Sequence, residues 1–183
     1  GSHQGTPKAL TVSGITAANK VYDATTLAAV SLSGLQKTGL LTGDVLTVSA
    51  TGAFATKNVG TAKTVNLTET VGGADAANYS ITLQGTTTAS VSRKALSYAG
   101  LSSADKVYDG TMAATVSGTA VLQDAVTLGT GTSGDARLYA GDVVALSGTA
   151  TGGFNAQSVS QANRVTFYGL SLSGSDAANY SLS

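Results

Sequence analysis

Apolar residues alternate with polar ones along most of the chain. Leu10 and Val12 lie between polar neighbours near the N-terminus, and Val65 and Leu67 repeat the pattern further along. Because successive side chains of a strand point to opposite faces, this period of two predicts strands with one buried face. A period of 3.6 residues is not sustained anywhere, so any helix is expected to be one or two turns long. The pattern predicts an all-β protein.

Two segments of the chain occur twice. Residues 20–25 read KVYDAT and residues 106–111 read KVYDGT, while DAANYS stands at 75–80 and again at 176–181. A tandem duplication explains both pairs, since repetition at a fixed period is the signature of arrays of small folding units. We therefore predict a leader with an expression-vector remnant at 1–6 and two repeats, at 7–92 and 93–183. Each repeat is large enough for a modest core.

Each repeat is predicted to be an immunoglobulin-like β-sandwich. Turn residues separate the short strands at intervals of about 8 to 12 residues, which is typical of sandwiches and barrels. A Tyr at the start of a late strand, with Asp four positions earlier, is similar to the corner at which immunoglobulin-type folds fix a loop through the Tyr hydroxyl. The alternative is a β-grasp unit, with residues 75–79 in one short helix. The residues expected to have structural roles are Tyr22, Asp23, Asp75, Tyr79, Tyr108, Asp109, Asp176 and Tyr180.

The second repeat carries an insertion. The KVYD segments begin 86 residues apart, but the DAANYS segments begin 101 residues apart, a difference of 15. Most of the added residues fall near 123–139, where we expect an extra hairpin with a Gly-rich turn. Loops that lengthen in one repeat only are where recognition tends to be added to a scaffold. The candidate ligand contacts are Asp124, Asp135, Arg137 and Tyr139. The alternative is a structural hairpin that covers the edge of the core.

The second repeat also ends earlier than the first. Ser183 aligns with Thr82, so an equivalent of residues 83–92 is not part of the sequence. We expect the second repeat to lack its last strand. An exposed sheet edge of this kind offers unpaired backbone groups to a neighbouring chain.

Composition and charge argue against several classes of function. Charged residues are 11% of the chain and the formal net charge is zero, so no basic surface for nucleic acid is indicated. The chain has no cysteine, and its one histidine, His3, belongs to the expected remnant. A cysteine or histidine nucleophile system and the usual zinc ligands are therefore not expected. No apolar run is long enough to span a membrane. We expect no enzyme activity, cofactor, metal site, nucleic-acid partner or direct membrane insertion.

The KVYDGT segment resembles the YDG repeat, related to MBG modules, of very large bacterial adhesins, including filamentous-haemagglutinin-like proteins exported by two-partner secretion. Supporting segments are GDV at 43–45, FATKNVGTAKTV at 54–65 and ADAANY at 74–79. One departure is Ala24, which stands where the motif has Gly. Either this position does not need a positive φ, or the first repeat tolerates roughly 1 kcal/mol of strain.

The resemblance implies a stalk or spacer segment of a secreted or surface-anchored bacterial adhesin. Such a segment would support cell–cell or biofilm-matrix attachment from outside the cell and would be monomeric in solution. The alternative is a recognition module, which would bind a polysaccharide or another copy of the adhesin through the insertion of the second repeat.

Overall fold

The computed structural model describes residues 5–129 and 133–183, so the expected vector remnant at 1–3 lies outside the described residues. The chain divides into two compact units. Unit 1 comprises Thr25–Ser92 and the chain up to Val21, and unit 2 comprises Arg93–Ser183 together with the three residues Tyr22–Ala24. A short segment from the early part of the sequence thus belongs to the later unit.

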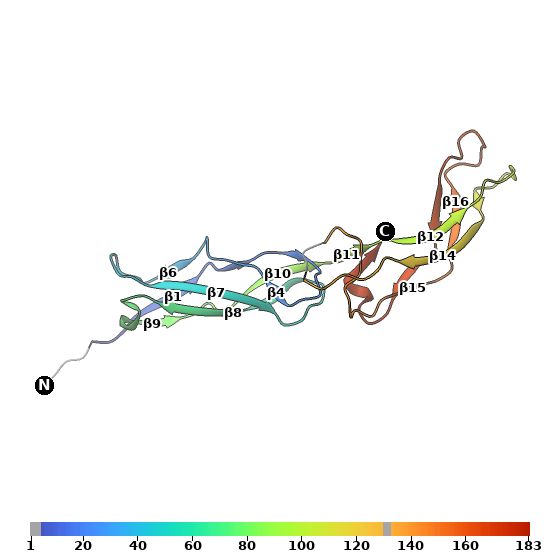
Figure 1. The fold of residues 1–183 in the computed structure, drawn as a ribbon. Helices are drawn as coiled ribbons and strands as arrows, with labels where there is room; N and C mark the ends of the chain where they lie inside the picture. Colours follow the sequence, from blue (N-terminus) through green and yellow to red (C-terminus); the bar gives the residue numbers. More distant parts are fainter. Residues whose placement is uncertain (1–4, 130–132) are drawn as a thin grey trace. The chain divides into compact units, whose positions relative to one another are not determined.

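Unit 1 consists of strands and one 3₁₀ turn. Its strands are β1 (Lys8–Ser13), β2 (Thr16–Ala17), β3 (Lys20–Val21), β4 (Leu27–Ala28), β5 (Val30–Ser31), β6 (Gln36–Thr38), β7 (Thr47–Phe54), β8 (Gly60–Gly72), β9 (Tyr79–Thr82) and β10 (Thr86–Ser92), with η1 at Ala76–Asn78. They form a five-stranded sheet in the order β3-β10-β8-β7-β4, a three-stranded sheet in the order β6-β1-β9, and the pair β2-β5. β7 and β8 run side by side over most of their length (Figure 1).

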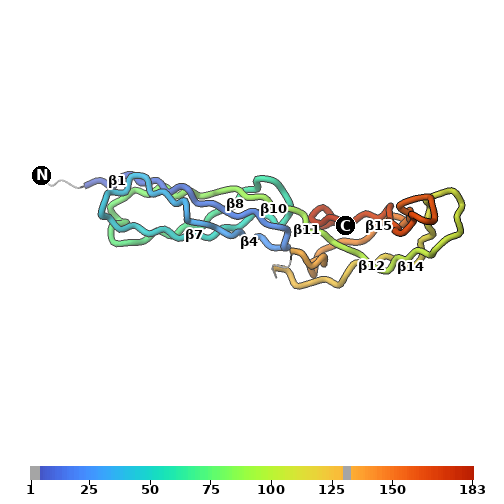
Figure 2. The backbone as a smooth tube through the Cα atoms, turned by 90° about the horizontal axis from the view of Figure 1, so that it is seen from above, coloured from blue at the N-terminus to red at the C-terminus, as the bar shows by residue number. Residues whose placement is uncertain are grey.

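The core of unit 1 lies between its two larger sheets. Leu10 and Val12 of β1 are each 1% exposed and cluster with Ile15, Leu46 and Tyr79. Partly buried residues of β7 and β8, Val48 and Leu67 among them, pack against this cluster. The alternation of apolar and polar residues is thus the alternation of inner and outer face, as predicted. Figure 2 follows the chain back and forth along unit 1, from β1 in blue to β10 in green.

Unit 2 has the same kind of composition in shorter elements. Its strands are β11 (Lys94–Leu96), β12 (Tyr98–Ser103), β13 (Ala113–Ala114), β14 (Val116–Leu122), β15 (Ala145–Ser147), β16 (Thr151–Phe154), β17 (Val165–Tyr168), β18 (Ser171–Ser173) and β19 (Tyr180–Leu182), with η2 at Ala177–Asn179. One sheet has three strands in the order β13-β16-β17, and three further pairs are β11-β19, β12-β14 and β15-β18.

The two units correspond residue by residue in part of their largest sheets. In unit 1, Phe54 is paired with Val65 and Gly52 with Leu67. In unit 2, Phe154 is paired with Val165 and Gly152 with Phe167, each position 100 residues later. β16 and β17 are therefore the counterparts of β7 and β8.

The prediction of an all-β protein is confirmed. Among the described residues there is no α-helix, and residues 76–78 and 177–179 form only single 3₁₀ turns. The β-grasp alternative needs a packed helix, for which these short turns offer no equivalent. The sheets are several and small.

The extra hairpin expected near 123–139 is not formed by the described residues of that stretch. Its two arms meet instead through a single parallel bridge between Val126 and Tyr139. Two antiparallel arms would make a hairpin, whereas the two segments that meet in this bridge run parallel. The tip at 130–132, where the Gly-rich turn was expected, lies outside the described residues.

Candidate functional site

A tyrosine fixes a corner in unit 1. The Tyr79 hydroxyl donates a hydrogen bond to the Asp44 carboxylate and accepts one from the Leu41 backbone N–H at 3.0 Å. Asp75, four residues before the tyrosine, accepts a hydrogen bond from the Val45 N–H at 2.6 Å. The hydrogen bond to Asp44, followed by burial, raises the pKa of the Tyr79 hydroxyl. The recurring Asp and Tyr therefore hold one loop by its backbone.

Unit 2 repeats this corner. The Tyr180 hydroxyl donates to Asp142 at 2.5 Å and accepts from the Tyr139 N–H at 2.9 Å. Asp176 accepts from the Val143 N–H at 2.8 Å. The carboxylates that receive the phenols, Asp44 and Asp142, were not predicted as site residues. The recurrence of GD at 43–44 and 141–142 was the signal that could have found them.

In unit 2 a second phenol enters the corner. The Tyr22 hydroxyl donates to the same Asp142 oxygen at 2.6 Å, and Tyr22 is completely buried. Its ring contacts those of Tyr139 and Tyr180 edge to face, with centroids 5.9 Å and 5.2 Å away. Burial, and then the hydrogen bond to Asp142, raises the pKa of the Tyr22 hydroxyl, and the same causes raise that of Tyr180. Unit 2 thus has an aromatic core built around one carboxylate.

A buried cation lies beside this aromatic core. Lys94 is fully buried, and its ammonium is 2.7 Å from an Asp135 carboxylate oxygen. The same ammonium lies 4.0 Å from the centroid of the Tyr139 ring. Asp135 also accepts a hydrogen bond from the Arg137 backbone N–H at 2.9 Å. The insertion therefore contributes a counter-ion for a charge that would otherwise be costly to bury.

The four predicted ligand contacts do not form one exposed surface. Tyr139 is 1% exposed, so its prediction as a contact residue is wrong. It stands two residues before the GD turn, at the place of Leu41, where Tyr22 and Lys94 cover its ring. Asp135 and Arg137 are half-buried, and Asp124 is exposed. Asp135 is engaged with Lys94, which leaves Asp124 and the Arg137 side chain as the accessible part of the predicted site.

The YDG turn itself is held by its lysine and aspartate. Asp109 accepts hydrogen bonds from the Lys106 ammonium at 2.9 Å and from the Thr111 N–H at 2.9 Å. These contacts hold the pKa of the Asp109 carboxyl at about 2. Lys106 also donates to the Ala113 carbonyl at 2.6 Å, as Lys20 does to the Leu27 carbonyl at 2.7 Å. The lysine thus closes the same turn in both repeats.

The motif tyrosines differ in their surroundings, although their turns agree. Tyr22 is completely buried in unit 2, whereas Tyr108 is 61% exposed. Asp23 lies in the same three-residue segment as Tyr22, and its backbone carbonyl accepts a hydrogen bond from the Gly129 N–H at 3.1 Å. At the fifth motif position Gly110 has a φ of +79° and Ala24 one of +62°. This position therefore does adopt a positive φ, and Ala24 bears the strain.

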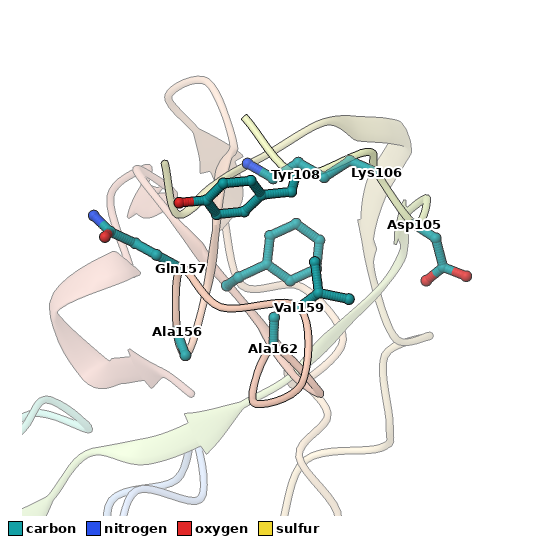
Figure 3. Close-up of a pocket in the computed structure, with 8 residues that line it drawn as sticks. Asp105, Lys106, Tyr108, Ala156, Gln157, Val159 and Ala162 are labelled. Carbon is teal, nitrogen blue, oxygen red and sulfur yellow. The ribbon is translucent and has the colours of Figure 1, made fainter. Parts of the chain in front are cut away.

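A groove of about 320 Å³ lies beside Tyr108 in unit 2. Figure 3 shows Tyr108 and Lys106 along one side of the groove, with Gln157, Val159 and Ala162 across from them. Phe154 forms part of its lining. Apolar and polar side chains both line the groove, which is a usual composition for a ligand-binding pocket.

The described residues show neither a cluster of metal ligands nor a membrane-spanning helix. Within residues 5–129 and 133–183, no group of three or more histidine, cysteine, aspartate or glutamate side chains is placed to hold a metal ion. No helix in that part of the chain has the length and apolar character to cross a membrane.

Comparison with known proteins identifies a domain family. The model of the YDG domain family matches residues 6–89 and 92–183. No curated protein and no solved structure matches the chain. The two matches cover nearly the whole sequence, and each contains one copy of the Tyr-Asp turn and one tyrosine corner. The chain therefore belongs to the YDG domain family, as two tandem repeats.

Proposed function

We propose that the chain is a pair of structural repeats from the stalk of a secreted or surface-anchored bacterial adhesin. The observation that carries the proposal is the way the recurring residues are used. Tyr79 and Tyr180 each accept a backbone N–H, and the motif lysines donate to backbone carbonyls. Side chains that hold loops in both copies serve the fold, which is the work of a spacer that extends reach by repetition.

The proposal includes an immunoglobulin-like arrangement of each repeat. Its support in unit 1 is the packing of the β1 sheet against β7 and β8 through Leu10, Val12 and Leu46. The tyrosine corner gives further support, because a Tyr hydroxyl that fixes a nearby loop is a feature of such sandwiches. An experimental structure of either repeat tests this assignment by its strand order.

An extracellular location and the absence of catalysis are part of the same proposal. The low content of charged residues and the lack of cysteine suit a chain that folds after passage through an export pore. The zero formal net charge argues against binding to nucleic acid or to an anionic membrane. The proposed partners are limited to the rest of the adhesin and to the matrix around it, and the chain itself is proposed to be a monomer.

The spacer role is tested by binding and by force. The purified chain is screened against glycan arrays and whole polysaccharides, and it is also stretched between two handles at its ends. A spacer gives no saturable binding and unfolds under force in separate events, one for each unit. Saturable binding to a polysaccharide contradicts the spacer role.

The alternative function is recognition through the insertion, and fewer of its candidate contact residues are exposed than the sequence predicted. Only Asp124 is exposed among the candidate contacts, and Arg137 is half-buried. If a polysaccharide binds, replacing both residues with Ala abolishes binding in the recognition model and leaves the melting temperature unchanged. Lys8→Ala, a change in unit 1, is the matched control. Binding that survives Asp124→Ala/Arg137→Ala excludes the insertion as the site.

A further inference from the structure

The two largest sheets differ at one edge. In unit 1, β10 lies between β8 and β3, antiparallel to the first and parallel to the second. In unit 2, β17 is the edge strand of its sheet among the described residues. β17 is the counterpart of β8, so the position next to it corresponds to that of β10.

The segments that would flank such a strand are less regular in unit 2. β8 begins at Gly60, while β17 begins only at Val165, the counterpart of Val65. Lys20–Val21 form β3, whereas Lys106 and Val107 belong to no strand. Several partners of β10 in unit 1, namely Lys20, Val21, Gly60, Lys63 and Thr64, thus have counterparts in unit 2 that belong to no strand.

The side chains at this edge are also less buried in unit 2 than in unit 1. In unit 1, Phe54 and Val65 are 3% and 0% exposed, and Ala89 and Val91 of β10 are 4% and 2% exposed. Their counterparts Phe154 and Val165 are only half-buried. The neighbouring Val107 and Val159 are 90% and 70% exposed. Exposed apolar side chains that gather at an unpaired sheet edge usually mark a surface that binds another polypeptide.

Polar residues at the edge of the groove match the residues beside β10 in unit 1. Lys106 holds the turn with the same carbonyl contact as Lys20, and its ammonium lies 5.4 Å from the Phe154 ring, against 5.3 Å for Lys20 and Phe54. In unit 1 the Asn19 side chain accepts a hydrogen bond from the Ser90 N–H of β10 at 2.7 Å. The residue at the equivalent position is Asp105, which lines the groove and also carries an acceptor.

We propose that the groove beside Tyr108 and the free edge of β17 form an acceptor site for a β-strand of the β10 type, supplied by YDG-repeat polypeptide. The strand lies antiparallel to β17 and parallel to Lys106 and Val107. Its small apolar side chains, the equivalents of Ala89 and Val91, cover Phe154 and Val165. Main-chain hydrogen bonds give the affinity and the alternating apolar positions give the register, as in other cases of strand addition. The site does not depend on the adhesin role, since it follows from the comparison of the two repeats.

The test adds the strand to the intact chain. Residues 83–92 of the first repeat are appended after Ser183, which occupies the position of Thr82. The control carries the same addition with the Ala89 and Val91 equivalents changed to Asp, so that length and backbone are preserved. Amide hydrogen exchange is followed at Val107 and over residues 160–166. The expected result is exchange at least about tenfold slower at these amides in the extended chain and unchanged exchange in the control.

A second measurement uses the unmodified chain. A synthetic peptide of residues 83–92 is titrated into it, with the Asp-substituted peptide as control. Saturable binding with the same protection of Val107 supports the site, and binding of both peptides alike overturns it. Absence of protection at Val107 in the extended chain also overturns the proposal. The appended strand would then remain unbound even though it is covalently attached near the groove.

Discussion

At the scale of single residues, Ala24 and Gly110 show what one position of the YDG motif requires. Both have a positive φ, +62° and +79°. For an L-residue with a Cβ atom this left-handed conformation costs about 1 kcal/mol or more, whereas glycine adopts it freely. The sequence alone left open whether the position needs such a φ, because a motif letter does not state a backbone angle.

We expect Ala24→Gly to stabilise unit 2 by about 1 kcal/mol and Gly110→Ala to destabilise it by a similar amount. A Cβ at Gly110 has only the Tyr108 hydroxyl near it, at 3.9 Å, so no clash adds to the backbone cost. Denaturant unfolding followed by amide exchange in unit 2 measures both changes. A loss of stability on Ala24→Gly contradicts the assignment of strain.

Asp109 makes the same turn sensitive to acid. Its contacts with Lys106 and Thr111 lower its pKa from 3.8 to about 2. A carboxyl with a depressed folded-state pKa contributes stability that is present above pH 3.8 and is lost as the pH falls toward about 2. We expect the YDG turn at Asp109 to loosen between these pH values, as seen by NMR shifts of Thr111. In Asp109→Asn the Thr111 shifts should vary little over that range, and an unchanged acid transition in this variant contradicts the role of the carboxylate.

At the scale of elements, the accuracy of prediction depended on how local the signal was. The alternation around Leu10, Val12 and Val65 located real strands because strand burial follows a period of two. The Gly-rich composition of the insertion suggested a hairpin, but its described residues form a single parallel bridge. Tyr139 was predicted to be exposed, but it is buried because it lies just before the GD turn. Nothing local to Lys94 indicated burial, since a lysine at a strand start is usually solvated.

The pair formed by Lys94 of β11 and Asp135 of the insertion offers an element-scale prediction. We expect Asp135→Ala to destabilise unit 2 by roughly 2–4 kcal/mol, because it leaves the buried Lys94 ammonium without its counter-ion. Lys94→Met together with Asp135→Ala should recover most of this loss, since it removes the buried charge as well. Chemical denaturation of the single and double variants measures the coupling. Equal destabilisation in the single and double variants would show that the ion pair is not the cause.

At the scale of the whole molecule, the Tyr22–Asp142 hydrogen bond makes the corner of unit 2 depend on two distant parts of the chain. Tyr22 and Tyr180 both have a raised pKa. A phenol with a raised folded-state pKa contributes stability that is fully present below pH 10.0 and is lost as the pH rises above it. The long-range pairing of Tyr22 could not be predicted from the sequence, since no local pattern records it.

Titration of the phenols by absorbance tests this arrangement. We expect Tyr22 and Tyr180 to remain protonated above pH 10.0, and to ionise only together with alkaline unfolding of unit 2. Tyr22→Phe should preserve the ring packing, lose about 1–3 kcal/mol from the bond to a charged acceptor, and remove one late-titrating phenol. If the variant retains the full late-titrating signal, Tyr22 is not one of the protected phenols.

The inclusion of Tyr22–Ala24 in unit 2 has a consequence for how this unit folds. Tyr22 is bonded to a residue 120 positions later in the chain. Until the part of the chain around Asp142 has folded, the Tyr22 hydroxyl cannot form this hydrogen bond. Contacts of such large sequence separation form late and slow the folding reaction. Completion of the second unit therefore requires the capture of a tyrosine that belongs to the early part of the first repeat.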